Sequence, residues 1–241
     1  MNKIIFITSI LLLVCLSSIS NAQISFEIGP NIGIISPTGS YAGNVNDFYL
    51  GNKYGLGTGF NVGATAKLDL FLLSGRVDLN YSWLSNSGSL TSSNGTVNTK
   101  QNIFSLGAGP EYKLNIPMSP IKPYACFELL FSTISGETTF QGAAQVSSNT
   151  LKIASATRTG ISLIVGSEIS FKTWTLDLNV RYNLHNLAGK KFDTYHNNDR
   201  TNSYSALNDG GDPDFDGNNH PVGSSRNITT VQLNVGVLFG L

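Results

Sequence analysis

The sequence has 241 residues, and only 12% of them are charged, with 15 Lys and Arg balancing 15 Asp and Glu. Ordinary soluble domains carry about 25% charged residues, so this chain is poor in charge. A nucleic-acid partner is not expected, because such proteins show a basic excess. The length suits a single large domain.

The N-terminus has the pattern of a secretory signal peptide. Lys3 precedes an apolar run from Ile4 to Leu16, and small residues occupy Ser20 and Ala22. We therefore expect cleavage before Gln23, with residues 1–22 as the signal peptide and 23–241 as the mature domain. The alternative, a membrane anchor, would need roughly 20 apolar residues.

The two cysteines do not predict a lipid anchor or a disulfide. Val14 stands where a lipobox requires a small residue before Cys15. Removal of the signal peptide leaves Cys126 alone, so no intramolecular disulfide can form and stability must have another source.

Alternation of apolar and polar residues dominates the mature chain. In the first run Phe26 and Ile28 share one face, while Glu27 and Gly29 share the other, which is the two-residue period of a β-strand. The same pattern predicts eight strands: Ile24–Ile34, Leu56–Leu68, Ser74–Trp83, Asn102–Leu114, Lys122–Ser132, Arg158–Phe171, Leu176–His185 and Thr230–Leu241. The fifth is the least regular, because Leu130 falls on its polar side.

Long and short connections alternate between these strands. The long polar stretches are Ser36–Tyr54, Ser85–Thr99, Thr133–Thr157 and Ala188–Arg226, and the short ones are Asp69–Leu73, Asn115–Pro120 and Lys172–Trp174. Transmembrane β-barrels have long outer loops and short periplasmic turns. The pattern therefore predicts an all-β, closed antiparallel transmembrane barrel of eight strands.

The polar face indicates which side of the barrel meets lipid. A soluble barrel alternates too, with its apolar face inward, but its outer face would carry many Lys and Glu. Here the polar face is rich in glycine, such as Gly33, Gly63 and Gly107, which suits a narrow interior. Aromatics near the strand ends suit membrane girdles: Tyr81, Trp83, Phe104, Phe131 and Tyr182 at the outer rim, and Phe26, Tyr112, Phe171 and Phe239 at the inner rim.

Pro30 and Pro110 fall inside predicted strands. Proline removes a ladder hydrogen bond and normally occupies an edge or a bulge. Since a closed barrel has no edge, we expect a bulge at each proline.

Short motifs add a family resemblance. They are Gly29–Gly33 (GPNIG), Gly107–Tyr112 (GAGPEY), Lys122–Tyr124 (KPY) and Arg181–Leu184 (RYNL). With them the chain resembles the PorT-like outer-membrane β-barrel family across its mature length. The resemblance implies a barrel in the cell outer membrane and gives weak support to a role in a secretion system. We expect outer-membrane lipid as a partner, with other envelope proteins as further candidates.

The charges on the polar strand faces are nearly balanced. The acids are Glu27, Asp78, Glu111, Glu128, Glu168 and Asp177, and the bases are Lys67, Arg76, Lys113, Lys122, Arg158 and Arg181. A catalytic interpretation would need a carboxylate pair beside a substrate cleft. We favour an ion-paired plug that includes Tyr124, because the interior of an eight-stranded barrel is just wide enough for side chains to fill. No open pore is expected.

Two weaker candidates lie in the last loop. Barrel enzymes that act on lipid place histidine and acidic residues near the outer rim. This chain has Asp193, His196 and Asp199 there. Its other histidines are His185 and His220. Asp212, Asp214 and Asp216 precede Gly217 at alternate positions, as in the start of an EF-hand calcium loop, but Gly223 stands where that loop has glutamate. We therefore assign no catalytic, cofactor or metal residue, with calcium kept as a hypothesis.

The sequence thus favours a non-enzymatic outer-membrane barrel with a structural or surface-interaction role. An accessory component of a protein secretion system and a lipid-modifying outer-membrane enzyme remain as alternatives.

Overall fold

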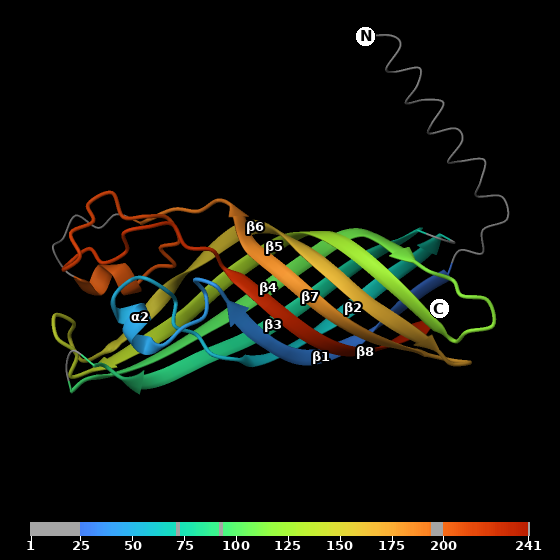
Figure 1. Cartoon of the computed structure of the whole chain (residues 1–241), viewed down its shortest axis with the longest axis horizontal. Coiled ribbons are helices and arrows are strands. Elements are labelled where there is room, and N and C mark those ends of the chain that lie inside the picture. Colours follow the sequence, from blue (N-terminus) through green and yellow to red (C-terminus); the bar gives the residue numbers. More distant parts are fainter. Residues whose placement is uncertain (1–24, 71–72, 92–93, 194–199, 241) are drawn as a thin grey trace, which may run out of the picture.

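The computed structural model describes residues 25–70, 73–91, 94–193 and 200–240. In this part of the chain eight antiparallel strands close into a barrel, each paired with its sequence neighbour and β8 with β1 (Figure 1). The strands are β1 Ser25–Thr38, β2 Gly59–Leu70, β3 Leu73–Ser89, β4 Thr96–Lys113, β5 Ile121–Gln141, β6 Thr150–Ser170, β7 Thr175–Ala188 and β8 Thr229–Gly240. The predicted all-β closed barrel is confirmed. The predicted signal peptide, Ile24 and Leu241 lie outside the described residues.

Two short helices lie in the loops at the far end from the start of β1. The helix α2 spans Val45–Tyr49, and the amide of Asp47 donates to the Asn44 side chain that caps it (2.9 Å). The 3-10 helix η2 spans Arg200–Tyr204. No helix among the described residues is long and apolar enough to cross a bilayer.

The strands differ greatly in length. β5 and β6 have 21 residues each, whereas β2 and β8 have 12. A membrane-spanning strand needs only about 9–11 residues. About half of β5 and β6 therefore projects beyond the bilayer, and Figure 1 shows these hairpins reaching past the short strands.

This projection corrects two predicted loops. Most of the stretches 85–99 and 133–157 is strand, with only residues 90–95 and 142–149 left as connections. The sequence pattern missed these strands because they project beyond the lipid. Their outer face is polar there, so the apolar alternation used to find strands is lost.

The two faces of these strands exchange polarity where they leave the membrane. In the membrane half the outward side chains are apolar, and their last members are Trp83, Phe104 and Phe131. The outward residues that come next are Ser85, Asn102 and Thr133, while Leu84, Ile103 and Ile134 are buried on the inner face. We call the parts of β3 to β6 beyond this reversal, residues 85–89, 96–102, 133–141 and 150–157, the extension.

The prolines do not create bulges. β1 keeps one register with β8 from Glu27 to Thr38, and β4 keeps one register with β5, but pairing lapses at Gly29–Pro30 and at Gly109–Pro110. Each proline lacks an amide proton, so hydrogen bonds of the ladder are lost there. No extra residue is inserted, as a bulge would require. The register shifts recorded in the described ladders lie instead between Ile134 and Gly136 and between Thr159 and Ile161.

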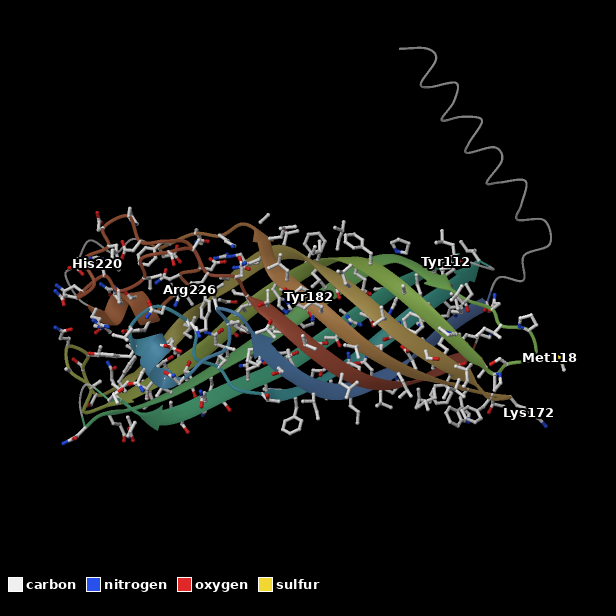
Figure 2. All side chains as sticks on the ribbon, in the orientation of Figure 1. Tyr112, Met118, Lys172, Tyr182, His220 and Arg226 are labelled. Carbon is white, nitrogen blue, oxygen red and sulfur yellow. The ribbon has the colours of Figure 1, made fainter. Side chains whose placement is uncertain are left out.

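The aromatic girdles occupy only one half of the molecule. The predicted members at both rims are at least partly exposed on the outer face. Figure 2 places Tyr112 near one end and Tyr182 close to the middle of the long axis, with Arg226 and His220 beyond it. The membrane therefore surrounds the half of the barrel in which β1 begins and β8 ends, and the other half lies outside the membrane.

Glycines on the inner face make room for large interior side chains. A Cβ atom at Gly107 would lie 2.4 Å from Oε2 of Glu128, and one at Gly166 would lie 2.5 Å from the ring of Tyr124. The predicted role of interior glycine is confirmed at these two positions.

Candidate functional site

The membrane half of the barrel interior is filled by a cluster of ion pairs. Its cations are Lys67, Arg76, Lys113 and Arg181, and its carboxylates are Asp78, Glu111, Glu128, Glu168 and Asp177, all of them buried. The charges predicted to point inward thus do so. Glu27 and Lys122 are only half-buried at the inner rim.

Arg76 lies at the centre of the cluster. Its guanidinium contacts Asp78 (2.6 Å), Glu111 (3.0 Å) and Asp177 (3.2 Å), and it also donates to the hydroxyl of Tyr124 (2.9 Å). Tyr124 in turn donates to Asp177 (2.5 Å). Side chains from β3, β4, β5 and β7 therefore meet across the lumen. A buried charge is tolerated when it is paired in this way.

Lys67 and Arg181 extend the cluster in opposite directions. Lys67 contacts Glu168 (2.5 Å) and Glu111 (3.0 Å). Arg181 contacts Asp78 (2.8 Å) and Glu128 (3.3 Å). Glu128 depends mainly on Arg181, because Nε of Arg76 is 3.8 Å away from it.

Asparagine side chains form the next layer toward the outer end. Asn61 donates to Asn234 (2.7 Å), Asn234 donates to Asn179 (3.1 Å), and Asn31 donates to Thr65 (3.1 Å). These side chains are buried and come from β1, β2, β7 and β8. These four strands are neighbours in the ring, so this layer lines one side of the lumen.

An apolar plug lies beyond the amides. It combines inward residues of the strands with residues of the outer loops: Ile35, Leu84, Ile103 and Ile134 from the strands, and Tyr41, Tyr54, Leu56, Leu207 and Ile228 from the loops. Each member is at most 3% exposed. The alternation did not reveal this plug, because its apolar residues interrupt the polar side of the strands, as the inward Leu130 also does.

The outer loops fold into a compact cap over this plug. We define the cap as residues 39–58, 189–193 and 200–228, and Figure 1 shows it lying against the projecting hairpins. A second apolar cluster joins it to the inner face of the extension: Val45, Phe48, Tyr49, Leu90, Val97, Phe140, Val146 and Tyr204. A gap between cap and wall has a volume of about 10 Å³, which leaves room for one water molecule at most.

Arginines fasten the parts of the cap to one another. Arg200 donates to the hydroxyl of Tyr204 (3.0 Å) and to the carbonyl oxygen of Tyr49, and it stacks over the ring of Tyr49 (4.3 Å). Arg226 donates to the carbonyl oxygen of Asn208 (2.7 Å) and stacks over Tyr54 (4.1 Å). Burial raises the pKa of Tyr204 to about 12, so its hydroxyl stays protonated and donates at physiological pH.

One ion pair joins the cap to the barrel wall. Nε and Nη2 of Arg158 donate to Asp209 (2.8 and 2.7 Å), and Asn186 donates to the same carboxylate (2.9 Å). Burial by itself would raise the pKa of Asp209, but these hydrogen bonds outweigh it and hold the pKa below its usual value. Arg158 was expected within the plug of strand residues, and its partner is instead a loop residue that sequence reasoning did not identify.

The three calcium candidates are not gathered around a common point. Asp212 accepts from the amide of Asp214 (2.9 Å) and pairs with Nδ1 of His220 (2.8 Å), while Asp216 accepts from the amides of Asn218 and His220. Hydrogen bonds from these amides lower the pKa of Asp216. Among the described residues, no three His, Cys, Asp or Glu side chains lie where they could share a metal ion.

The structure describes only some of the residues considered for catalysis. His196 and Asp199 lie outside the described residues, and Asp193 pairs with Lys191 (2.8 Å). The structure brings His185 to the hydroxyl of Ser132 (2.8 Å), a pair that the sequence did not predict. The other ring nitrogen of His185 contacts Thr230 (3.1 Å) rather than a carboxylate. Ser132 is 0% exposed, so a substrate cannot reach it in this arrangement.

The model of the outer membrane protein beta-barrel domain family matches residues 8–206. The chain belongs to this family. The matched segment ends before β8, which the structure supplies as the strand that closes the ring. This family member is therefore a protein of the cell outer membrane, surrounded by its lipid, and the predicted location is confirmed.

Solved structures with a similar fold include other outer-membrane proteins. Neisserial surface protein A is 18% identical, covering 89% of this chain and 96% of its own, with a TM-score of 0.48. OprG from Pseudomonas aeruginosa is 10% identical over 91% and 97%, with a TM-score of 0.49. Ail of Yersinia pestis, solved with the heparin analogue sucrose octasulfate, is 12% identical over 90% and 97%, with a TM-score of 0.37. No curated protein matches the chain.

Proposed function

We propose that this outer-membrane barrel is a closed, non-enzymatic scaffold that presents a folded cap at the cell surface. The observation that carries the proposal is the continuous filling of the lumen. Ion pairs, amides and an apolar plug succeed one another along the barrel, and the cap covers the last of them.

A transport role fits this interior poorly. A water-filled channel needs a hydrated path, but the strands here bury large side chains across the lumen, including Arg76, Tyr124 and Ile134. The arginines that fasten the cap also bind backbone carbonyl oxygens, which makes it a folded unit rather than a set of free loops. A rigid surface of this kind suits recognition.

An enzymatic role fits equally poorly. In the described part of the chain no carboxylate lies within hydrogen-bonding distance of the Ser132–His185 pair, and both side chains are buried. A nucleophile must meet both its base and its substrate. This pair contributes to packing of the wall below the cap.

Cysteine labelling in intact cells tests the orientation of the cap. Cys126 is free and buried, so a large maleimide reagent gives little background. We expect an Asn218→Cys variant to react in intact cells, because Asn218 is exposed in the cap. The matched control, Met118→Cys at the opposite end, should react only after the outer membrane is opened (Figure 2). The reverse pattern would contradict the proposal.

A second candidate is the accessory secretion role implied by the PorT-like resemblance. One observation favours it: the turn between β4 and β5 exposes Ile116 and Met118. Figure 2 places Met118 beyond the girdle residue Tyr112, and this residue adopts a φ of 61°. Contiguous exposed apolar patches mark partner contacts. A photocrosslinker at Met118 should capture an envelope protein if this role holds, and one at Lys172, in another turn at that end, serves as the control. Recovery of lipid adducts alone at both positions would remove this candidate.

A further inference from the structure

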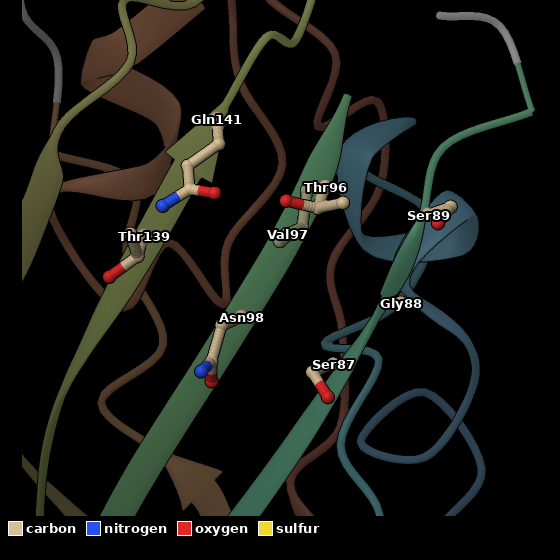
Figure 3. A pocket seen from close by; sticks show the side chains of 8 residues that line it. All are labelled: Ser87, Gly88, Ser89, Thr96, Val97, Asn98, Thr139 and Gln141. Atoms are coloured by element: carbon tan, nitrogen blue, oxygen red, sulfur yellow. The ribbon is translucent and has the colours of Figure 1, made fainter. Parts of the chain in front are cut away.

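A polar groove of about 390 Å³ opens on the outward face of the extension, across β3, β4 and β5 (Figure 3). Two rows of paired residues line it. Ser89, Thr96 and Gln141 form one row, and Ser87, Asn98 and Thr139 form the other. Neighbouring strands lie about 4.8 Å apart, so each row presents its polar groups at regular intervals over about 10 Å.

Most of these polar groups have no partner in the protein. Within the described ranges, the side-chain amides of Asn98 and Gln141 make no hydrogen bond, and the Thr139 hydroxyl contacts only that of Thr150 (2.8 Å). The backbone beneath them is fixed by the strand ladders. The groove therefore offers donors and acceptors that are carried on a fixed backbone and remain available to a ligand.

The groove carries no charge. The nearest cation along β4 is Lys100, which is paired with Glu137 on β5 (3.2 Å). A phosphate or sulfate ligand would require an unpaired cation, since charge-assisted hydrogen bonds hold such groups. Hydroxyl and amide side chains act as donor and acceptor at once, which matches the hydroxyl groups of a sugar.

The height of the groove above the membrane agrees with a sugar ligand. Thr139 lies about eight residues beyond the girdle residue Phe131, or roughly 26 Å further along β5. With a strand tilt of about 45°, this distance along the strand places Thr139 about 18 Å above the hydrocarbon core of the bilayer. The same outward face contacts lipid lower down, so the molecules beside the groove are the headgroups of neighbouring outer-leaflet lipids.

We propose that the groove binds uncharged sugar units of the glycolipid that surrounds the barrel in the outer leaflet. The inference rests on the proposed orientation, with the cap and extension outside the cell. Asn98 and Gln141 would supply the central hydrogen bonds, and the hydroxyls of Ser87, Ser89 and Thr96 would surround them.

The test uses the full mature protein in phosphatidylcholine nanodiscs. The probe is dephosphorylated core oligosaccharide released from lipopolysaccharide, and the measurement is saturation-transfer NMR from protein to sugar. The native protein should transfer saturation, and Asn98→Ala with Gln141→Ala should weaken binding about tenfold, as expected for two lost hydrogen bonds. The matched control is Thr133→Ala with Thr157→Ala, a hydroxyl pair on the same extension away from the groove (3.3 Å apart). It should bind as the native protein does.

A second arm identifies the source of the sugar. When the same oligosaccharide is attached to lipid within the nanodisc, it should displace the soluble probe, because the groove opens directly above the bilayer. Undiminished binding of the soluble probe would overturn the assignment to surrounding glycolipid. Absence of transfer, or equal weakening in both variants, would overturn the site itself. Neither result depends on orientation in cells, which the cysteine labelling measures separately.

Discussion

Arg181 gives the sharpest test of the interior ion pairs. Its side chain is 2% exposed and contacts Asp78 (2.8 Å) and Glu128 (3.3 Å). Arg181→Ala would leave Asp78 with Arg76 at 2.6 Å, but the nearest cationic nitrogen to Glu128 would then be 3.8 Å away. Glu128 would thus be left buried with only the more distant ion pair to Arg76.

The expected loss follows from that arrangement. Removing one partner of a buried ion pair costs about 3–5 kcal/mol, and because Asp78 keeps Arg76 we expect about 3 kcal/mol here. Denaturant unfolding in lipid vesicles, followed by tryptophan emission, measures this difference. The double variant Arg181→Met with Glu128→Gln removes the stranded charge, so it should regain most of the stability.

The matched control is Lys100→Ala. Lys100 pairs with Glu137 at 3.2 Å on the exposed outer face, where both side chains are about half exposed. Exposed pairs contribute less than about 1 kcal/mol. If Arg181→Ala lost no more stability than Lys100→Ala, the lumen would be hydrated and the argument for a packed interior would be refuted.

Three further predictions concern the cap and the N-terminus. Folding lowers the pKa of Asp209, so this carboxylate stabilises the folded cap above its unfolded pKa of about 3.9, and the stabilisation is lost as the pH falls below that value. We therefore expect pepsin to cleave the native cap faster below about pH 4. Cleavage of the Asp209→Asn variant should depend less on pH. Since Asp212 is already paired with His220, we expect calorimetry at millimolar calcium to give the same heats for the native protein and for Asp214→Ala with Asp216→Ala, and a larger native heat would support the calcium hypothesis. Terminal sequencing of the outer-membrane fraction should show a mature chain that starts at Gln23, and an intact residue 1 would contradict the predicted cleavage.

The membrane half of the fold could be predicted from the sequence because lipid imposes a strict rule on it. Every second residue must be apolar, as in the run through Val77, Leu79 and Tyr81, and the inward charges follow from the same alternation. Strand number, closure and the inward direction of Arg76 and Arg181 were therefore accessible without a structure.

The strands of the extension could not be predicted from the sequence, for a physical reason. Beyond the girdle no lipid selects apolar side chains, so Thr139 and Asn98 resemble loop residues although they pair in strands. The plug residue Ile134 interrupts the polar inner face, and its role appears only when the cap residues Tyr41 and Leu207 reach it from distant segments. Contacts of this kind leave no local pattern.

A lumen closed from the ion-pair cluster to the cap should conduct no ions. Planar-bilayer recording of the purified native protein tests it most directly, because a packed interior gives ions no hydrated path. We predict no steady current at any applied voltage that the bilayer withstands. Stable, reproducible conductance steps from the unmutated protein would show that the interior is a channel and would contradict this account.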